Sequence, residues 1–256
     1  MKKVLKLIIL SLILITIILS TLSAISVKKY YDINRLCTLI NANKTTEAKT
    51  MIGKIKNVNS FTAPLWLRKI YNMFEYDIDT PLIKACEKGD VEIVSALLYK
   101  GADPNLSLEG GWAPLEVVYI RNSENRIAIA KILLNNGAQV DLYRSHGSAL
   151  FIEAEKCIYK TTFSEDEQNL LTESIFLLLE NGASPINKKG DTIIHYLAYG
   201  GQTKLIELLA SDYGYLFEKE NLNGETPLDW AKQSGKYNEN LENILLKTGD
   251  GSLSYS

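Results

Sequence analysis

The 256-residue chain has few residues of the kinds that bind metals or form disulfides, namely three cysteines and two histidines. Cys37, Cys86 and Cys157 are widely spaced, odd in number and form no CxxC pair, which argues against a disulfide framework or a zinc site. We expect buried free thiols, and a single disulfide if the domain meets an oxidising compartment. His146 and His195 alone do not supply a metal site, so we expect no metal and no other cofactor.

The sequence also lacks the short motifs of common enzymes and an excess of basic residues. We find neither a phosphate-cradling GxxxxGK string nor a GxSxG nucleophile elbow, and we predict no catalytic residue and no enzyme. The first 29 residues hold five lysines and no acidic residue, and the rest of the chain holds 23 basic and 30 acidic residues, a net charge of −7. Because binding to nucleic acid relies on Lys and Arg neutralising phosphates, we exclude nucleic acid as a partner.

The N-terminus carries a long apolar run. Leu7–Val27 contains no charged residue and has lysines on both sides. A helix needs about 20 apolar residues to cross the hydrocarbon core of a bilayer, and this run is long enough. We therefore expect an uncleaved signal-anchor that makes a single-pass membrane protein and leaves the following domain outside the cytoplasm. The alternative is a signal peptide with its core at Leu7–Leu19, cut after Ala24, which would release the domain to the periplasm or the exterior.

Five short strings recur at similar intervals along the remainder of the chain. The strings are Thr80–Leu82, Ala113–Leu115, Ser148–Leu150, Thr192–Ile194 and Thr226–Leu228. A Leu-Leu pair and then a glycine follow each string, and these glycines are Gly101, Gly137, Gly182, Gly214 and Gly249. Recurrence at a period between about 20 and 50 residues is typical of repeat proteins.

The chemistry of the strings predicts two helices in each repeat. A Thr followed by Pro places a hydroxyl at the helix N-cap and an imino acid at the first helical position, where no backbone donor is needed. The glycine supplies the left-handed residue that ends the second helix. Between these marks, apolar residues such as Val91, Val94, Leu97 and Leu98 give each helix one buried stripe. A single helix pair cannot cover that stripe, so neighbouring pairs must stack.

This pattern resembles the ankyrin repeat, most clearly in TPLIKACEKGDVEIVSALLYKGADPN (80–105) and NGETPLDWA (223–231). The resemblance implies an all-α solenoid of stacked helix-turn-helix units with short hairpin loops, here preceded by an N-terminal hydrophobic helix. We divide the chain into an anchor or signal peptide (1–29), a helical capping region (30–76), about five ankyrin repeats (77–249) and a tail (250–256). The export segment and the frequent Lys, Ile and Asn give it the look of a bacterial protein.

Three segments depart from a regular repeat. Ile33–Ile40 and Thr46–Ile55 look like a degenerate helix pair that caps the array. Phe61–Tyr76 is apolar and is interpreted as a helix packed on that cap, with a partner-binding or membrane-proximal helix as the alternative. The third repeat has extra residues around 159–168, which we expect to project as a loop, and the string that starts at Ser164 predicts a capping box for the helix that follows.

The resemblance also implies roles for individual residues. His195 occupies the histidine position of the TPLH pattern and is expected to hydrogen-bond within its own turn, and His146 is expected in an exposed turn. Partners of ankyrin repeats bind the concave side, which is built from the hairpin tips and the ends of the first helices. Carried over position by position, this predicts a partner-binding set of Trp112, Arg121, Arg144, Lys188, Lys189, Tyr199, Leu222 and Asn223.

Two functions from different classes follow from these expectations. The first is a membrane-tethered module that binds or inhibits another protein outside the cytoplasm. The second is a structural or self-associating scaffold that organises a membrane complex. An enzyme is a distant third, because the residues offer no catalytic constellation.

Overall fold

The computed structural model describes residues 2–62, 79–107, 111–121, 123–142, 148–160 and 162–247, without the side chains of residues 2–13, 19, 22–26 and 247. The chain divides into two compact units, Met1–Leu108 and Glu109–Ser256, and each is described by itself. The described helices of the first unit are α1 (Lys2–Asn41), α2 (Thr45–Lys54), α4 (Pro81–Lys88) and α5 (Val91–Tyr99). Those of the second unit come in four consecutive pairs: α6 (Pro114–Arg121) with α7 (Arg126–Asn135), α8 (Ala149–Tyr159) with α9 (Glu165–Glu180), α10 (Ile193–Tyr199) with α11 (Thr203–Tyr213), and α12 (Pro227–Gln233) with α13 (Glu239–Lys247).

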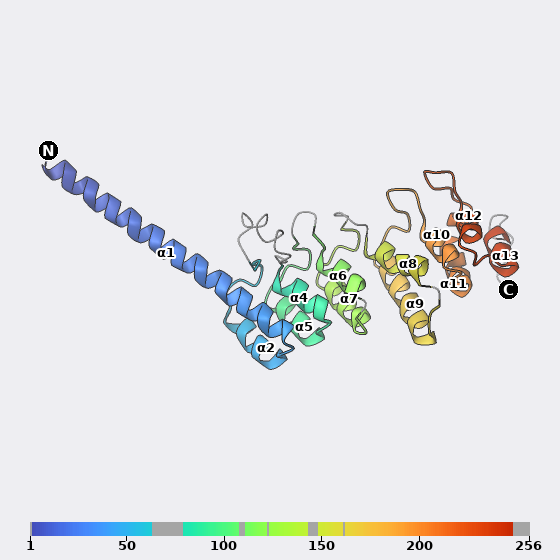
Figure 1. Ribbon diagram of the computed structural model, residues 1–256, viewed down its shortest axis with the longest axis horizontal. Coiled ribbons are helices and arrows are strands. Elements are labelled where there is room, and N and C mark those ends of the chain that lie inside the picture. The colour runs from blue at the N-terminus through green and yellow to red at the C-terminus, as the bar shows by residue number, and fades with distance from the viewer. Residues whose placement is uncertain are drawn as a thin grey trace. The chain divides into compact units, whose positions relative to one another are not determined.

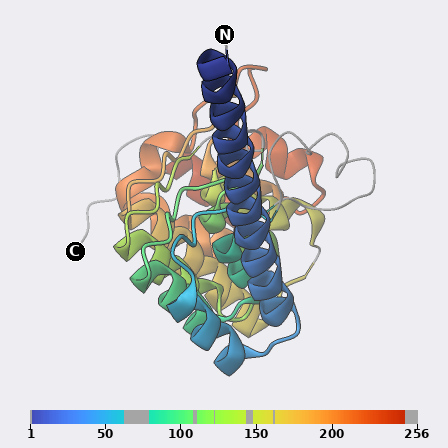
Figure 2. The same cartoon turned by 90° about the vertical axis from the view of Figure 1, so that its left-hand side faces the viewer.

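The first unit starts with the predicted capping pair. The C-terminal part of α1 packs on α2 and α4, while α2 and α4 both pack on α5 (Figures 1 and 2). Ile33, Leu36 and Ile40 form the buried stripe of α1, and Ile52 contributes to that of α2. Their spacing of three and four residues is the helical period, so helices are present where the sequence predicted a helix pair, and the capping role of that pair stays a prediction.

Helix α1 runs without a break across the boundary placed after residue 29. The anchor or signal peptide predicted for residues 1–29 falls largely on side chains that lie outside the described part. Among the residues that the structure describes, no helix combines the length and the apolar character needed to cross a bilayer.

The pair α4–α5 shows how the repeat string folds. The Thr80 hydroxyl accepts a hydrogen bond from the Ile83 amide at 3.2 Å, and Pro81 occupies the first helical position. Asp90 caps α5 in the same way, by accepting from the Ile93 amide at 3.0 Å. Gly101 ends the pair with a φ of 87°, a left-handed conformation that favours glycine. The local chemistry of the string therefore sets both ends of the pair.

The second unit stacks its helix pairs in two rows. The first helices α6, α8, α10 and α12 lie side by side in one row, and contacts between α7 and α9 and between α11 and α13 build the other (Figure 1). Thr192 and Thr226 cap α10 and α12 with their hydroxyls, and each is part of a reciprocal capping box. Gly137 and Gly182 both have a φ of 87°. The helix-turn-helix repeat predicted for this region is confirmed here.

One expected feature of the repeats is wrong. Gly214 was predicted to end a helix in the left-handed conformation, but its φ is −56° and the chain continues into the short 3₁₀ helix η2 (Gly214–Leu216). Leu216 and Phe217 are buried there, and their burial favours continued helical winding after Gly214. Ser148 occupies the N-cap position of α8, yet its hydroxyl makes no capping hydrogen bond.

Most of the extra residues of the third repeat lengthen its two helices, and the described residues 160 and 162–164 between those helices are non-helical. Helix α8 has 11 residues and α9 has 16, against 8 and 9 in α4 and α5. The capping box predicted at Ser164 is present: its hydroxyl accepts from the Glu167 amide at 3.3 Å, and the Glu167 carboxylate accepts from the Ser164 amide at 3.0 Å. This cap starts α9 early, and the added turns of α8 and α9 extend both rows of helices.

Three further predictions lie outside the described residues. They are the helix over most of Phe61–Tyr76, the turn at His146 and the tail from residue 250. The three cysteines are described, and all are buried free thiols, as expected.

Candidate functional site

The last two hairpin tips of the chain are built by the same asparagine-centred turn. The Asn187 side-chain oxygen accepts from the amides of Lys189 (2.8 Å) and Asp191 (3.0 Å). Asn221 repeats this arrangement with the amides of Asn223 (2.9 Å) and Glu225 (3.1 Å). An asparagine that accepts from amides two and four residues ahead fixes the backbone of a turn. The two tips are therefore preformed surfaces of defined geometry.

The two tips are joined to each other. The Leu222 amide donates to the Lys189 carbonyl at 3.0 Å, and the Asn221 side-chain amide donates to the Asp191 carboxylate at 2.9 Å. Gly190 permits the close approach, because it has a φ of 79° and a Cβ at this position would lie 3.1 Å from the Leu222 nitrogen. These contacts hold Lys189, Leu222 and Asn223 on one continuous edge.

Trp230 of α12 anchors the surface beneath the tips. Its indole donates to the Glu225 carboxylate at 3.1 Å. Its ring centroid lies 5.3 Å from that of Tyr196 and 6.1 Å from that of Tyr199, within the usual range of aromatic pairs. Hydrogen bonds from Gln233, from Trp230 and from the Asn221 side chain lower the pKa of Glu225. Trp230, Tyr196 and Tyr199 form an aromatic floor, and the Trp230 indole links this floor to the ionised Glu225 carboxylate at the second tip.

His195 ties helix α10 to the second tip. Its Nδ1 accepts from the Thr192 amide at 3.0 Å, and its Nε2 lies 2.9 Å from the Glu225 carbonyl. A neutral ring with its proton on Nε2 satisfies both contacts. Burial lowers the pKa of His195, which favours this neutral form. The structural role predicted for His195 within its turn is confirmed.

The tips and the first helices enclose a groove of about 430 Å³, which we call the tip groove. It is lined by residues of α8, α10, α12 and the two tips: Glu155, Ile158, Tyr159, Lys189, Asp191, Tyr196, Leu222, Asn223 and Trp230. Leu222 is 79% exposed and Tyr159 is 81% exposed, so two large apolar side chains stand in solvent beside the groove. Burial raises the pKa of Glu155, and the ammonium group of Lys189 opposes that shift.

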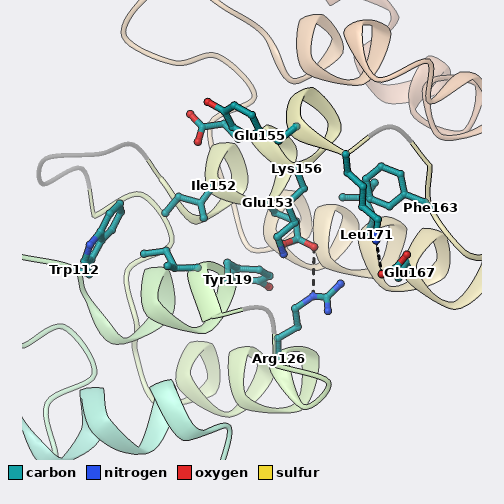
Figure 3. Close-up of a pocket in the computed structure, with 13 residues that line it drawn as sticks. Trp112, Tyr119, Arg126, Ile152, Glu153, Glu155, Lys156, Phe163, Glu167 and Leu171 are labelled. Carbon is teal, nitrogen blue, oxygen red and sulfur yellow. Dashed lines mark hydrogen bonds and ion pairs between the residues drawn. The ribbon is translucent and has the colours of Figure 1, made fainter. Parts of the chain in front are cut away.

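A second pocket of about 720 Å³ lies next to the tip groove and shares Glu155 and Tyr159 with it. We call it the Arg126 pocket, and it lies among α6, α7, α8 and the start of α9 (Figure 3). Its polar floor is made by Tyr119, Arg126, Glu153 and Lys156, and Trp112 and Phe163 stand on its walls.

Charged groups meet on the floor of the Arg126 pocket. The Arg126 Nε lies 3.4 Å from one carboxylate oxygen of Glu153, and the Lys156 ammonium contacts the other. Burial lowers the pKa of Lys156 although Glu153 opposes the shift, and burial together with Glu153 raises the pKa of Tyr119. The Tyr119 hydroxyl therefore remains a hydrogen-bond donor at neutral pH.

The described residues offer surfaces for binding and no cluster of metal ligands. No group of three or more His, Cys, Asp and Glu side chains is placed to hold a metal ion in the part of the chain that the structure describes. The arrangement instead offers preformed tips, an aromatic floor and a polar pocket, which are the features of a binding surface.

Comparison with known proteins decides the family. A family model described as ankyrin repeats (3 copies) matches residues 40–144 and 167–251, well over half of the chain. The chain belongs to the ankyrin-repeat family. Ankyrin repeats bind other proteins, so the expectation of a protein-protein interaction module is supported at this level.

Three relatives share these ankyrin repeats. The human transient receptor potential cation channel subfamily A member 1 is 30% identical over 193 residues, which cover 72% of this chain and 16% of the channel. The mouse 2-5A-dependent ribonuclease is 40% identical over 77 residues, or 30% of this chain and 10% of the ribonuclease. The bovine mitochondrial disaggregase is 28% identical over 159 residues, or 60% of this chain and 21% of the disaggregase. The chain spans about a fifth or less of each of these relatives.

The ankyrin fold brings half of the predicted partner-binding residues to the two pockets. Lys189, Leu222 and Asn223 line the tip groove, and Trp112 lines the Arg126 pocket. Tyr199 is half-buried against Trp230 and supports the floor.

The other predicted residues line neither pocket. Lys188 is exposed on the first tip beside Lys189, and Arg121 is exposed at the end of α6. Arg144 lies outside the described residues.

Sequence reasoning missed Tyr159, Phe163 and Trp230 as lining residues, and it missed the turn asparagines Asn187 and Asn221. The asparagines had a usable signal, because the strings NKKGDT (187–192) and NLNGET (221–226) occupy equivalent places just before two successive helix caps. The three aromatic residues had none, since their position depends on how far α8 extends and on how the repeats stack.

Proposed function

We propose that this ankyrin protein works by binding a partner protein at the tip groove of its second unit. The observation that carries the proposal is the exposed Leu222 and Tyr159 beside an aromatic floor whose geometry is fixed by hydrogen bonds. A preordered surface loses little conformational entropy on binding, so more of the contact energy appears as affinity. Tyr and Trp are also residue types that dominate measured binding hot spots.

The polar groups of the groove give it selectivity. Glu155, Lys189 and Asn223 line the groove together with its apolar residues, and protein interfaces likewise combine an apolar centre with a polar rim. Because the two tips are hydrogen-bonded to each other, the positions of these polar groups relative to one another are fixed. We infer that the partner presents an apolar residue to the Trp230 floor and pairs polar groups with the rim.

We further propose that the module is tethered to a membrane and meets its partner outside the cytoplasm. The support is the uncharged run Leu7–Val27 between flanking lysines, together with the length that a bilayer crossing requires. Alkaline carbonate should leave the chain in the membrane fraction, whereas detergent should release it. Recovery in the soluble fraction with residues 1–29 intact would contradict the tether.

Site-specific photo-crosslinking in the native host tests the binding face. A photoreactive phenylalanine analogue placed at Leu222 and, separately, at Tyr159 is expected to capture the same protein, identified by mass spectrometry. Tyr215 provides the control position, because it is 69% exposed on η2 and lies outside the tip groove.

The pattern of capture distinguishes binding at the tip groove from nonspecific contact with the exposed surface. Capture of one species from both groove positions and little from Tyr215 supports the proposal. Equal capture at Tyr215, or no shared species between Leu222 and Tyr159, would overturn it. Repeating the experiment with Trp230→Phe tests the floor, since this change removes the indole donor to Glu225 while retaining an aromatic ring.

A further inference from the structure

The carboxylates at the tip groove outnumber its cationic groups. Glu155 and Asp191 line the groove. Glu225 lies beside it and accepts from the Trp230 indole, which is itself a lining group, at 3.1 Å. Among the described residues, Lys189 alone brings a positive charge to the lining. Three carboxylates therefore face one ammonium group, and the negative charge is in excess.

Neutral groups satisfy these carboxylates as far as they are satisfied at all. Asp191 accepts from two asparagine side chains, and Glu225 accepts from an indole and from two side-chain amides. In the described part of the chain, none of the three carboxylates has a cation within 4.0 Å, and Glu155 accepts no hydrogen bond. Lys189 lowers the pKa of Glu155 through space without forming an ion pair with it. The excess negative charge of the groove is thus uncompensated.

Glu155 is the carboxylate that an incoming cation can reach. Its side chain is exposed, whereas Asp191 is buried and both of its carboxylate oxygens accept from amides. Figure 3 shows Glu155 directed away from the ion pair of Arg126 with Glu153. Tyr159 lies four residues further along α8, which puts it on the same face of the helix, and its ring is largely exposed. An aromatic ring attracts a cation over its face, so these two groups together suit a basic side chain.

Tyr196 shows that the lining carboxylates act on the same part of the groove. Burial raises the pKa of Tyr196, and the charges of Asp191 and Glu155 raise it further, so its hydroxyl lies in the field of both carboxylates. Tyr159 also acts on this hydroxyl. A negative potential shared in this way attracts a cation and repels an anion.

We propose that the tip groove receives a basic residue, arginine or lysine, from the partner protein. Its cationic group pairs with Glu155 in the field of Asp191 and Glu225, and its alkyl stem lies along the Tyr159 ring. The apolar residue that meets the Trp230 floor lies close to it in the partner. This inference rests on the proposed function, because the occupant is the same partner.

Three probes of similar length test the charge preference on the full chain in neutral detergent micelles. They are n-butylguanidinium, its neutral isostere n-butylurea and the anion pentanoate, each titrated by saturation-transfer NMR. The guanidinium should bind at least about fivefold more tightly than the urea, and pentanoate should bind most weakly. Equal binding of guanidinium and urea, no binding of the guanidinium, or tighter binding of pentanoate would overturn the proposal.

Two variants should shift the affinity for n-butylguanidinium in opposite directions. Glu155→Gln should lower it about two- to fivefold, and Lys189→Met should raise it, because this change removes the ammonium group that opposes the incoming cation. The matched control is Glu207→Gln on the exposed face of α11, outside the groove, which should leave the affinity unchanged. A common structural defect cannot move the affinity both ways. Unchanged affinity in Glu155→Gln, or a fall in Lys189→Met, would contradict the assigned contact.

Charge reversal in the host tests whether the occupant is the partner. Glu155→Lys should lower photo-crosslinking from Leu222, whereas Glu207→Lys should not. The partner peptide attached at Leu222, sequenced by mass spectrometry, should carry an arginine or lysine within a few residues of the attachment point. Undiminished capture in Glu155→Lys, or a peptide without a basic residue, would show that the assignment to the partner is wrong.

The two experiments distinguish failure of this inference from failure of the proposed function. If Leu222 and Tyr159 capture one species while n-butylguanidinium shows no preference over n-butylurea, the basic residue is wrong and the proposed function stands. If the guanidinium binds through Glu155 while Leu222 captures nothing in the parent chain, the proposed function fails together with the assignment to the partner, and the cation preference of the groove stands.

Discussion

At the scale of single residues, the second unit shows how one side chain can connect two repeats. His195 belongs to the fourth repeat string, and its ring bridges its own N-cap residue Thr192 and the Glu225 carbonyl, 30 residues further along the chain. The contact with the Thr192 amide requires a neutral ring, because protonated Nδ1 cannot accept a hydrogen bond, whereas Nε2 can donate to the Glu225 carbonyl in either form. The N-cap of α10 is therefore coupled to the protonation of His195.

This coupling predicts how stability depends on pH. The folded-state pKa of His195 is lowered by burial, so between that value and the ordinary value of about 6.5 the unfolded chain binds the extra proton. The stabilisation from the neutral ring should be complete above about pH 6.5 and should be lost as the pH falls through the folded-state pKa. Urea midpoints of parent and His195→Gln, measured from pH 8 to pH 5, should differ at pH 8 and converge on acidification. A constant difference across that range would contradict the coupling.

At the scale of elements, the lengths of α8 and α9 distinguish the third repeat from the others. Counted back from the glycine that closes each repeat, the Ser164 capping box starts α9 earlier than α5 starts in its repeat, so α9 has 16 residues and α5 has 9. The longer α8 carries Tyr159 at its last position, where it lines both pockets. The insertion thus supplies lining residues to the two candidate binding pockets. The Ser164 capping box is the local feature that fixes where α9 begins.

Removing that cap should therefore weaken the second unit. Ser164→Ala loses the hydroxyl that accepts from the Glu167 amide, and loss of an N-cap side chain costs about 1 kcal/mol of folding free energy. The thermal midpoint should fall by about 2–4 °C, measured by circular dichroism. The matched control is Ser211→Ala on the exposed face of α11, where alanine favours a helix interior and the midpoint should hold or rise. Equal thermal midpoints for Ser164→Ala and Ser211→Ala would contradict a stabilising role for the Ser164 cap.

At the scale of the whole molecule, each of the two units buries cysteine side chains in its core. Cys37 and Cys86 lie in the core of the first unit and Cys157 in that of the second. Burial raises the pKa of Cys37 and of Cys157 to about 12, and it also raises that of Cys86. A thiol of this kind is neither accessible nor ionised at neutral pH, so it is a poor nucleophile.

Thiol labelling should therefore report folding of both units. The native chain should react with a disulfide-exchange reagent at pH 7 far more slowly than the chain in denaturant, where all three thiols should react. Mass spectrometry of partly labelled protein assigns each site. Rapid labelling of Cys157 in native protein would contradict the packing of α8 in the second unit, and rapid labelling of Cys37 or Cys86 would do so for α1 and α4.

Several helix ends and the family of this protein could be predicted from its amino-acid sequence without further information. Thr80, Thr192 and Thr226 cap helices, and Gly101, Gly137 and Gly182 end repeats, because these roles depend on backbone chemistry within a few residues. The same local logic predicted the Ser164 capping box and the role of His195 in its turn. It was wrong at Gly214, where burial of Leu216 and Phe217 prevailed over the left-handed preference of glycine.

The meeting of distant side chains could be known only from the folded chain. Tyr159 and Trp230 line one groove although they belong to different repeats, and Arg126 of α7 contacts Glu153 of α8 in the next pair. No local pattern encodes such contacts, because they depend on the stacking of neighbouring repeats and on the lengths of α8 and α9. The same holds for the charged groups of the Arg126 pocket. Burying a guanidinium costs folding free energy only where packing has removed its hydrating water, and the sequence does not show where that happens.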